Sequence, residues 1–200
     1  MRVVGVLLFP EFELLDVFGP LEVFGNRILQ HHYRVCTVAE AAGPIASAQG
    51  TRAVADHALA SCPPLDIILV PGGMGTRREV DHPSITRWIA ARAVDAELVL
   101  SVCTGAALLA RAGVLDDRRA TTNKLAFDSV VSQGPRVTWV RKARWVEDGK
   151  FVTSSGVSAG IDMALAVVAK TVDAGTASQT ARVMEYTRHT NPDDDPFARD

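Results

Sequence analysis

One cysteine of the chain, Cys103, stands where nucleophilic chemistry is expected. Leu98–Val102 is an apolar run typical of a short buried strand, and Thr104–Ala112 has the pattern of a helix. Gly105 is small enough for the sharp strand-to-helix turn that exposes a nucleophile above a sheet. Unpaired N–H groups at the start of a helix favour the thiolate, the nucleophilic form of cysteine. A small buried hydrophobe is the competing interpretation, but the turn favours Cys103 as the catalytic nucleophile.

Asp16 is the candidate acid–base residue. It lies between Leu14-Leu15 and Val17-Phe18, and apolar surroundings raise the pKa of a carboxyl group. Such a group gives and takes protons near neutral pH. The alternative for Asp16 is a helix cap. Glu22, six residues later, is left open between a pocket role and a structural one.

A glycine-rich loop follows another apolar strand. The strand Asp66–Val70 ends in Pro71-Gly72-Gly73-Met74-Gly75, and glycines let a backbone approach a ligand closely. The segment lacks the lysine and Ser/Thr of a phosphate-binding loop, so its remaining alternative is a plain turn. We predict Gly72, Gly73 and Gly156, the last just before a late helix, as substrate-binding positions.

These residues must be positioned by alternating strands and helices, which predict a parallel sheet covered on both faces. The fold class is therefore α/β. Ligands of such sheets bind at the carboxyl ends of the strands, where Asp16, the glycine loop and Cys103 all fall. We expect the first long helix to begin at Pro20, with Asp16 in the preceding loop. The other expected helices are 84–93, 124–132, 159–172 and 176–188, and Asp148-Gly149 predicts a hairpin turn.

Composition narrows the function classes. The 200 residues are 48% hydrophobic and 22% charged, with a net charge of −2, so a basic surface for nucleic acid is not expected. No apolar run is long enough for a membrane helix. Three scattered cysteines indicate a reducing, cytoplasmic location. We expect one domain over residues 1–190, an acidic surface tail over residues 191–200, and no metal.

The motifs together resemble the ThiJ/PfpI superfamily, a branch of the class I glutamine-amidotransferase-like fold. The likeness rests on strand–Pro-Gly-Gly, strand–Cys-Thr-Gly–helix and Arg-Ala-Thr-Thr-Asn, and it covers about residues 3–170. The opening LFPEFELLDVFGPLEVF is similar to isocyanide (isonitrile) hydratases and to domains of some transcription regulators. The resemblance implies a flavodoxin-like, doubly wound fold and a homodimer.

For the site, the resemblance to the hydratases implies that Cys103 adds to the isocyanide carbon while Asp16 works beside it. Thr104 would help to hold the reacting groups or water, and the amides of Gly72 and Gly73 would lie near the thiol as in an oxyanion site. No cofactor is implied, and the partner is a small molecule. Many relatives carry histidine where this chain has Asn123, and the role of Asn123 is left open.

Three alternatives are weighed against the hydratase. A protease or amidotransferase is disfavoured because Thr104 stands where peptidase-like members carry histidine, and none of the five histidines lies in an obvious site loop. A glyoxalase or deglycase would use Cys103 on α-oxoaldehydes. A ligand-sensing or oxidation-sensing domain would use the same thiol without turnover.

Overall fold

A seven-stranded sheet forms the centre of the computed structural model, which describes residues 1–198. The strand order is β10-β11-β7-β6-β1-β2-β5, and every neighbouring pair is parallel except β10–β11. Because both faces are covered, the inner strands are rich in apolar residues, and all four residues of β6 are apolar and buried. The strands are β1 (Arg2–Leu7), β2 (Tyr33–Ala39), β5 (His57–Ala58), β6 (Ile67–Val70), β7 (Leu98–Ser101), β10 (Trp145–Asp148) and β11 (Phe151–Ser154).

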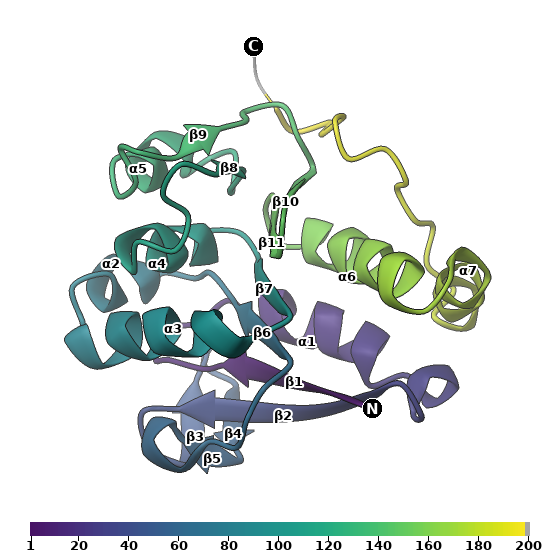
Figure 1. Cartoon of the computed structure of the whole chain (residues 1–200), viewed down its shortest axis with the longest axis horizontal. Coiled ribbons are helices and arrows are strands. Elements are labelled where there is room, and N and C mark those ends of the chain that lie inside the picture. The colour runs from purple at the N-terminus through teal and green to yellow at the C-terminus, as the bar shows by residue number, and fades with distance from the viewer. Residues whose placement is uncertain (199–200) are drawn as a thin grey trace.

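Helices lie on both faces of this sheet (Figure 1). On one side are α1 (Leu14–Phe24), α6 (Ala159–Thr171) and α7 (Ala174–Val183), and on the other are α2 (Thr76–Glu79), α3 (Pro83–Asp95) and α4 (Gly105–Arg111). The predicted flavodoxin-like, doubly wound fold is confirmed. Within residues 1–198, no helix has the length and apolar character needed to cross a membrane.

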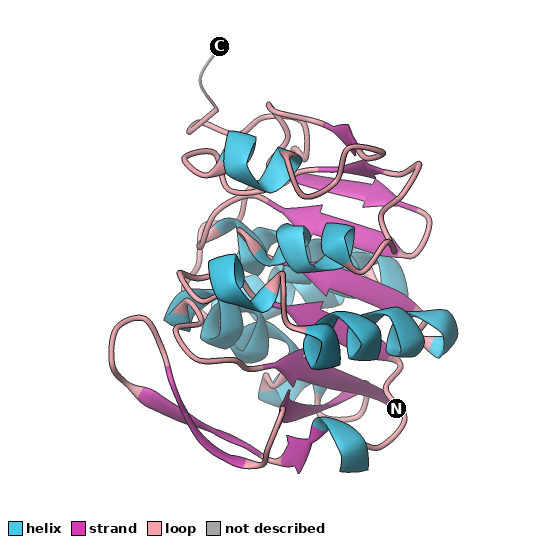
Figure 2. Cartoon of the chain, turned by 90° about the vertical axis from the view of Figure 1, so that its left-hand side faces the viewer, coloured by secondary structure: helices cyan, strands magenta, loops and turns pink. Residues whose placement is uncertain are grey.

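Smaller elements extend the fold at two places. A hairpin of β3 (Gly43–Ala46) and β4 (Arg52–Ala55) projects from the body of the molecule (Figure 2). At the other end, β8 (Arg119–Ala120) pairs with β9 (Thr138–Trp139) beside α5 (Phe127–Val131). The predicted Asp148-Gly149 hairpin is confirmed, since β10 and β11 pair across it and Gly149 has a φ of 62°.

The prediction that the first long helix begins at Pro20 is wrong, because α1 begins at Leu14 and contains Pro20. Proline lacks an N–H group and costs an interior helix one hydrogen bond. Close packing against α6 overrides this cost. A Cβ atom at Gly19 would lie 2.8 Å from Ile161, and one at Gly160 would lie 3.4 Å from Pro20. Asp16 therefore lies in the first turn of a helix instead of in a loop.

Two other helices are shorter than predicted. The fifth helix begins at Phe127, three residues after the predicted start at Lys124, and the seventh ends at Val183 instead of residue 188. Asn123 accepts a hydrogen bond from the Ala126 N–H, so the segment before α5 forms a turn. After α7 the chain turns away at Glu185, which has a left-handed φ of 49°.

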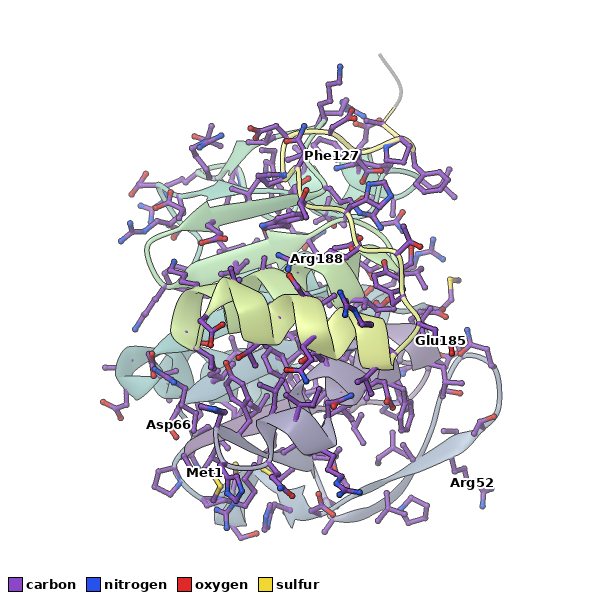
Figure 3. All side chains as sticks on the ribbon, turned by 90° about the vertical axis from the view of Figure 1, so that its right-hand side faces the viewer. Met1, Arg52, Asp66, Phe127, Glu185 and Arg188 are labelled. Atoms are coloured by element: carbon purple, nitrogen blue, oxygen red, sulfur yellow. The ribbon has the colours of Figure 1, made fainter. Side chains whose placement is uncertain are left out.

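The C-terminal segment runs from α7 back across the molecule towards the end that carries Phe127 (Figure 3). Most of it is exposed, as the acidic composition predicts, but Asp195 is 3% exposed. The backbone of Arg144 donates to Pro192 O at 2.7 Å, and that of Asp195 donates to Lys142 O at 3.0 Å. The tail is therefore attached to the segment before β10. Residues 199–200 of the predicted tail lie outside the described residues, and the domain boundary at 190 stays a prediction.

A buried charge cluster supports this attachment. Arg144 is 3% exposed and donates to Asp162 Oδ2 at 2.7 Å, while its other end lies 4.0 Å from Asp195. Asp162 in turn accepts from the His189 N–H at 2.9 Å. The Arg144 guanidinium thus links carboxylates from α6 and from the tail, and Lys124 Nζ, 3.9 Å from Asp195 Oδ2, supplies a second positive charge.

We predict that Arg144→Met lowers the free energy of unfolding by about 3–5 kcal/mol, because it leaves the buried carboxylate of Asp162 without an ion-pair partner. Urea denaturation at pH 7 measures the change. The matched control is Arg111→Met, which removes an exposed ion pair with Asp81 and should cost at most about 1 kcal/mol. If both variants lost the same free energy of unfolding, the buried cluster would contribute no more to stability than an exposed ion pair.

Candidate active site

Cys103 sits in a strained turn between β7 and α4. Its φ is 57°, a left-handed value that is costly for a residue with a side chain. Hydrogen bonds hold the turn, because Cys103 N–H donates to Ser155 O at 3.0 Å and Thr122 Oγ1 donates to Cys103 O at 2.7 Å. The turn also needs Gly105, where a Cβ atom would lie 2.2 Å from Val70 O. The predicted sharp strand-to-helix turn is confirmed.

The sulfur of Cys103 is surrounded by hydrogen-bond donors and one acid. Asn123 Nδ2 lies 3.2 Å from Sγ, and the backbone N–H groups of Thr104 and Val157 also point at the sulfur. Val157 has a left-handed φ of 44°, which turns its N–H inward. On the remaining side the thiol meets the carboxyl group of Asp16.

Asp16 is completely buried. Its Oδ2 accepts from the Gly72 N–H at 2.8 Å. The other oxygen, Oδ1, has no hydrogen-bond partner among the N–H and O–H groups of the described residues. A buried carboxylate oxygen without a donor is costly, and a proton on the carboxyl group removes much of that cost.

Burial controls the protonation of both groups. Loss of solvation raises the pKa of Asp16 from 3.8 to about 7, against the opposing effect of the Gly72 hydrogen bond. Burial, followed by the negative charge of Asp16, raises the pKa of Cys103 to about 12, although the amides of Thr104, Val157 and Asn123 lower it. The predicted effect of the helix N-terminus is present, since the Thr104 amide lowers the pKa of Cys103, but it does not make the thiolate the resting form. Desolvation outweighs the helix amides, and because Asp16 and Cys103 act on each other's pKa, their titrations are coupled.

Thr104 belongs to a hydroxyl network beside this pair. Its Oγ1 accepts from the Gly73 N–H at 3.0 Å and lies 3.0 Å from the hydroxyl of Thr76. Thr104 occupies the N-cap position of α4, but its side chain makes no capping bond. Thr76 was not predicted, although a hydroxyl residue directly after the glycine loop is a usable signal for such a contact.

The glycine loop positions side chains. The Gly72 amide binds Asp16 and the Gly73 amide binds Thr104, so both N–H groups that the resemblance assigns to an oxyanion site are occupied. A Cβ atom at Gly72 would lie 2.5 Å from Thr104 N, and Gly73 has a φ of 129°. Both positions therefore require glycine. Gly156 packs beside Asn123, where a Cβ atom would lie 2.6 Å from Nδ2.

A cavity of about 450 Å³ opens onto the sulfur. Cys103, Thr104, Gly73 and Asn123 lie on its wall, whereas Asp16 and Gly72 are not among its lining residues and Gly156 lines a neighbouring cavity. The rest of the wall comes from α2, α4 and the α5 region and combines apolar with polar side chains, namely Met74, Thr76, Arg77, Val80, Ala107, Ala126, Ser129, Val130, Ser132 and Gln133, with Glu13 and Val157 at its other edges.

Other predicted candidates lie elsewhere. Glu22 is exposed on α1 and does not line the cavity. Among the described residues, no histidine lines it either. Residues 1–198 contain no group of three or more His, Cys, Asp or Glu side chains arranged to hold a metal ion. Among the described residues, Asp16 is therefore the one group beside the sulfur that can titrate near neutral pH.

Residues 2–170 match the DJ-1/PfpI family, and the chain belongs to it. The isonitrile hydratase of Pseudomonas putida is 34% identical over 183 residues, which are 92% of this chain and 78% of the hydratase. A crystal structure of a ThiJ/PfpI family protein from Pseudomonas syringae superposes with a TM-score of 0.86 at 28% identity, covering 94% of this chain and 76% of that protein.

Regulators also resemble the chain. The HTH-type transcriptional regulator CdhR of Pseudomonas aeruginosa is 29% identical over 166 residues, which are 82% of this chain. The chain spans about half the length of that regulator (49%). The family therefore contains proteins named as enzymes and proteins named as regulators, and the chemistry of the site must distinguish them.

We predict that Asp16→Asn stabilises the fold at alkaline pH. Burial raises the pKa of Asp16 from 3.8 to about 7, so the wild type loses stability as the pH rises between these values, whereas an amide has no such loss. The free energy of unfolding of Asp16→Asn should exceed that of the wild type by almost nothing at pH 4 and by at most about 4 kcal/mol above pH 7. Urea denaturation across this range measures it, with the exposed Asp128→Asn as control. If the difference in unfolding free energy between Asp16→Asn and the wild type did not change with pH, the raised pKa of Asp16 would be contradicted.

Proposed function

We propose that this protein is a cysteine-dependent hydratase, a lyase that converts an isocyanide into an N-substituted formamide. The observation that carries the proposal is the buried pair of Cys103 and Asp16, which can pass one proton between them at the wall of a cavity. The 34% identity to an isonitrile hydratase supports the same chemistry.

The first step is addition of the thiol across the isocyanide carbon. The thiol proton of Cys103 passes to the Asp16 carboxylate, and the thiolate attacks the terminal carbon. Asp16 then delivers the proton to that carbon, which gives a thioimidate on Cys103. Because the isocyanide carbon needs both a nucleophile and a proton, a thiol and a carboxyl group in contact suit this reaction.

The second step is hydration of the thioimidate. A water molecule adds to the thioimidate carbon with Asp16 as base, and a proton goes to the substrate nitrogen. The C–S bond then breaks, the thiol of Cys103 recovers its proton, and an N-substituted formamide leaves. Thr104, which lines the cavity, would orient this water. The overall change is addition of one water, so neither an oxidant nor a cofactor is needed.

The glyoxalase alternative requires different catalytic groups in the site. Attack on an α-oxoaldehyde develops negative charge on oxygen, which free N–H donors would stabilise. The Gly72 and Gly73 amides are engaged by Asp16 and Thr104. The subsequent proton transfer between carbons needs a base as well, and no histidine lines the described cavity wall. These contacts favour the isocyanide.

A homodimer and a cytoplasmic location are part of this proposal. Leu15 and Phe18 are 41% and 45% exposed on successive turns of α1, which supports an apolar contact with a second copy. The three free cysteines fit a reducing compartment. A small molecule that fits the cavity is the proposed partner of the site.

We predict that the protein converts isocyanides and that Cys103→Ala abolishes this turnover. Benzyl isocyanide and tert-butyl isocyanide are incubated with the enzyme, and the formamides are quantified by NMR; methylglyoxal is tested in parallel. Cys62→Ala, which removes a buried thiol outside the cavity, is the control and should keep wild-type activity. Efficient conversion of methylglyoxal with both isocyanides untouched would exclude the hydratase. Binding without turnover of any of the three would favour the sensing alternative.

We further predict that kcat/KM rises with pH through an apparent pKa of about 7. Burial raises the pKa of Asp16 to this value, and the pair must lose its first proton before the thiol can be deprotonated by its neighbour. Asp16→Asn should remove this rise of kcat/KM with pH and lower kcat about 10²–10⁴-fold. A profile that stays flat from pH 5 to 9 would exclude Asp16 as the base.

A further inference from the structure

Asn123 makes two hydrogen bonds that fix the orientation of its amide group. Its Oδ1 accepts from the Ala126 N–H at 3.0 Å, and a backbone N–H can only donate. The oxygen must therefore face Ala126, which leaves Nδ2 on the side of Cys103 Sγ, 3.2 Å away. The amide is a donor to the sulfur by geometry.

The backbone around Asn123 is attached to the nucleophile turn itself. Thr122 Oγ1 donates to Cys103 O at 2.7 Å, and Thr121 N–H donates to Thr153 Oγ1 at 2.8 Å. Both threonines are fully buried. Gly156 leaves the space that the amide fills, because a side chain there would collide with Nδ2. The donor is held by contacts independent of any ligand.

The Asn123 amide affects which of the two groups, Asp16 or Cys103, carries the negative charge of the site. One negative charge shared by Asp16 and Cys103 can lie on the carboxylate with a neutral thiol, or on the thiolate with a neutral carboxyl group. A donor that touches only the sulfur stabilises the second state. Unlike an imidazole, an amide neither takes the thiol proton nor changes charge with pH, so the proton can go only to Asp16.

We propose that Asn123 is a catalytic hydrogen-bond donor, which stabilises the Cys103 thiolate and directs the thiol proton to Asp16. Its effect on the thiol is a property of the free protein. Its consequence for turnover rests on the proposed hydratase function.

The test measures the thiol without substrate. Iodoacetamide is reacted with the protein at pH 7–9, and the labelling rate of the Cys103 peptide is followed by mass spectrometry. Asn123→Asp is the main variant, because it keeps an oxygen for the Ala126 N–H and removes the donor to sulfur. Asn123→Leu removes both bonds. Gln179→Leu, which removes an exposed amide on α7 outside the cavity, is the matched control.

We predict that labelling of Cys103 slows about 5- to 20-fold in Asn123→Leu. Loss of a hydrogen bond to a charged group lowers the thiolate fraction roughly tenfold or more, and the higher nucleophilicity of a more basic thiolate partly offsets this. Asn123→Asp should slow it further, since a second carboxylate faces the sulfur, while Gln179→Leu should match the wild type.

Unchanged labelling in a folded Asn123→Asp protein, checked by circular dichroism, would overturn the proposal. The two hypotheses fail separately. Slower labelling in a protein that converts no isocyanide leaves the donor role of Asn123 intact and rejects the hydratase. Normal labelling in variants of an active hydratase rejects the role of Asn123 alone.

Discussion

The structure depends on one electrostatic constraint, the burial of a carboxyl group against a thiol. Neither Asp16 nor Cys103 has enough contact with water to hold a charge cheaply, and a charge on one raises the pKa of the other. At neutral pH the pair therefore holds at most one negative charge. A single mobile proton between an acid and a nucleophile is what addition of a thiol across a carbon atom requires.

The rest of the fold brings Asp16 and Cys103 together and shields them from water. Asp16 follows β1, the glycine loop follows β6 and Cys103 follows β7, and these are adjacent parallel strands in the sheet. Their carboxyl ends meet at one edge, as ligand sites of such sheets do. The Gly72 and Gly73 amides then fix Asp16 and Thr104, while the strained turn at Cys103 aims the sulfur at the cavity.

The sequence predicted the strands, the turn at Cys103 and the raised pKa of Asp16, because apolar runs and a carboxyl group in apolar company act locally. It misplaced the start of α1, because the packing of Gly19 and Gly160 that tolerates Pro20 joins segments far apart in the chain. It also predicted a thiolate from the helix N-terminus and could not weigh the burial that opposes it. The N–H of Val157 at the sulfur depends on a left-handed backbone at a β-branched residue, which no pattern indicates.

The measurement that tests the central claim most directly is the titration of the Asp16 carboxyl carbon by ¹³C NMR, assigned by comparison with Asp16→Asn. Since burial raises the pKa of Asp16, we expect its signal to titrate at about pH 7 in the wild-type protein. In Cys103→Ala the titration should shift, because the thiol no longer contacts the carboxyl group. Titration near the ordinary value of 3.8, unchanged by Cys103→Ala, would contradict the shared proton and the chemistry built on it.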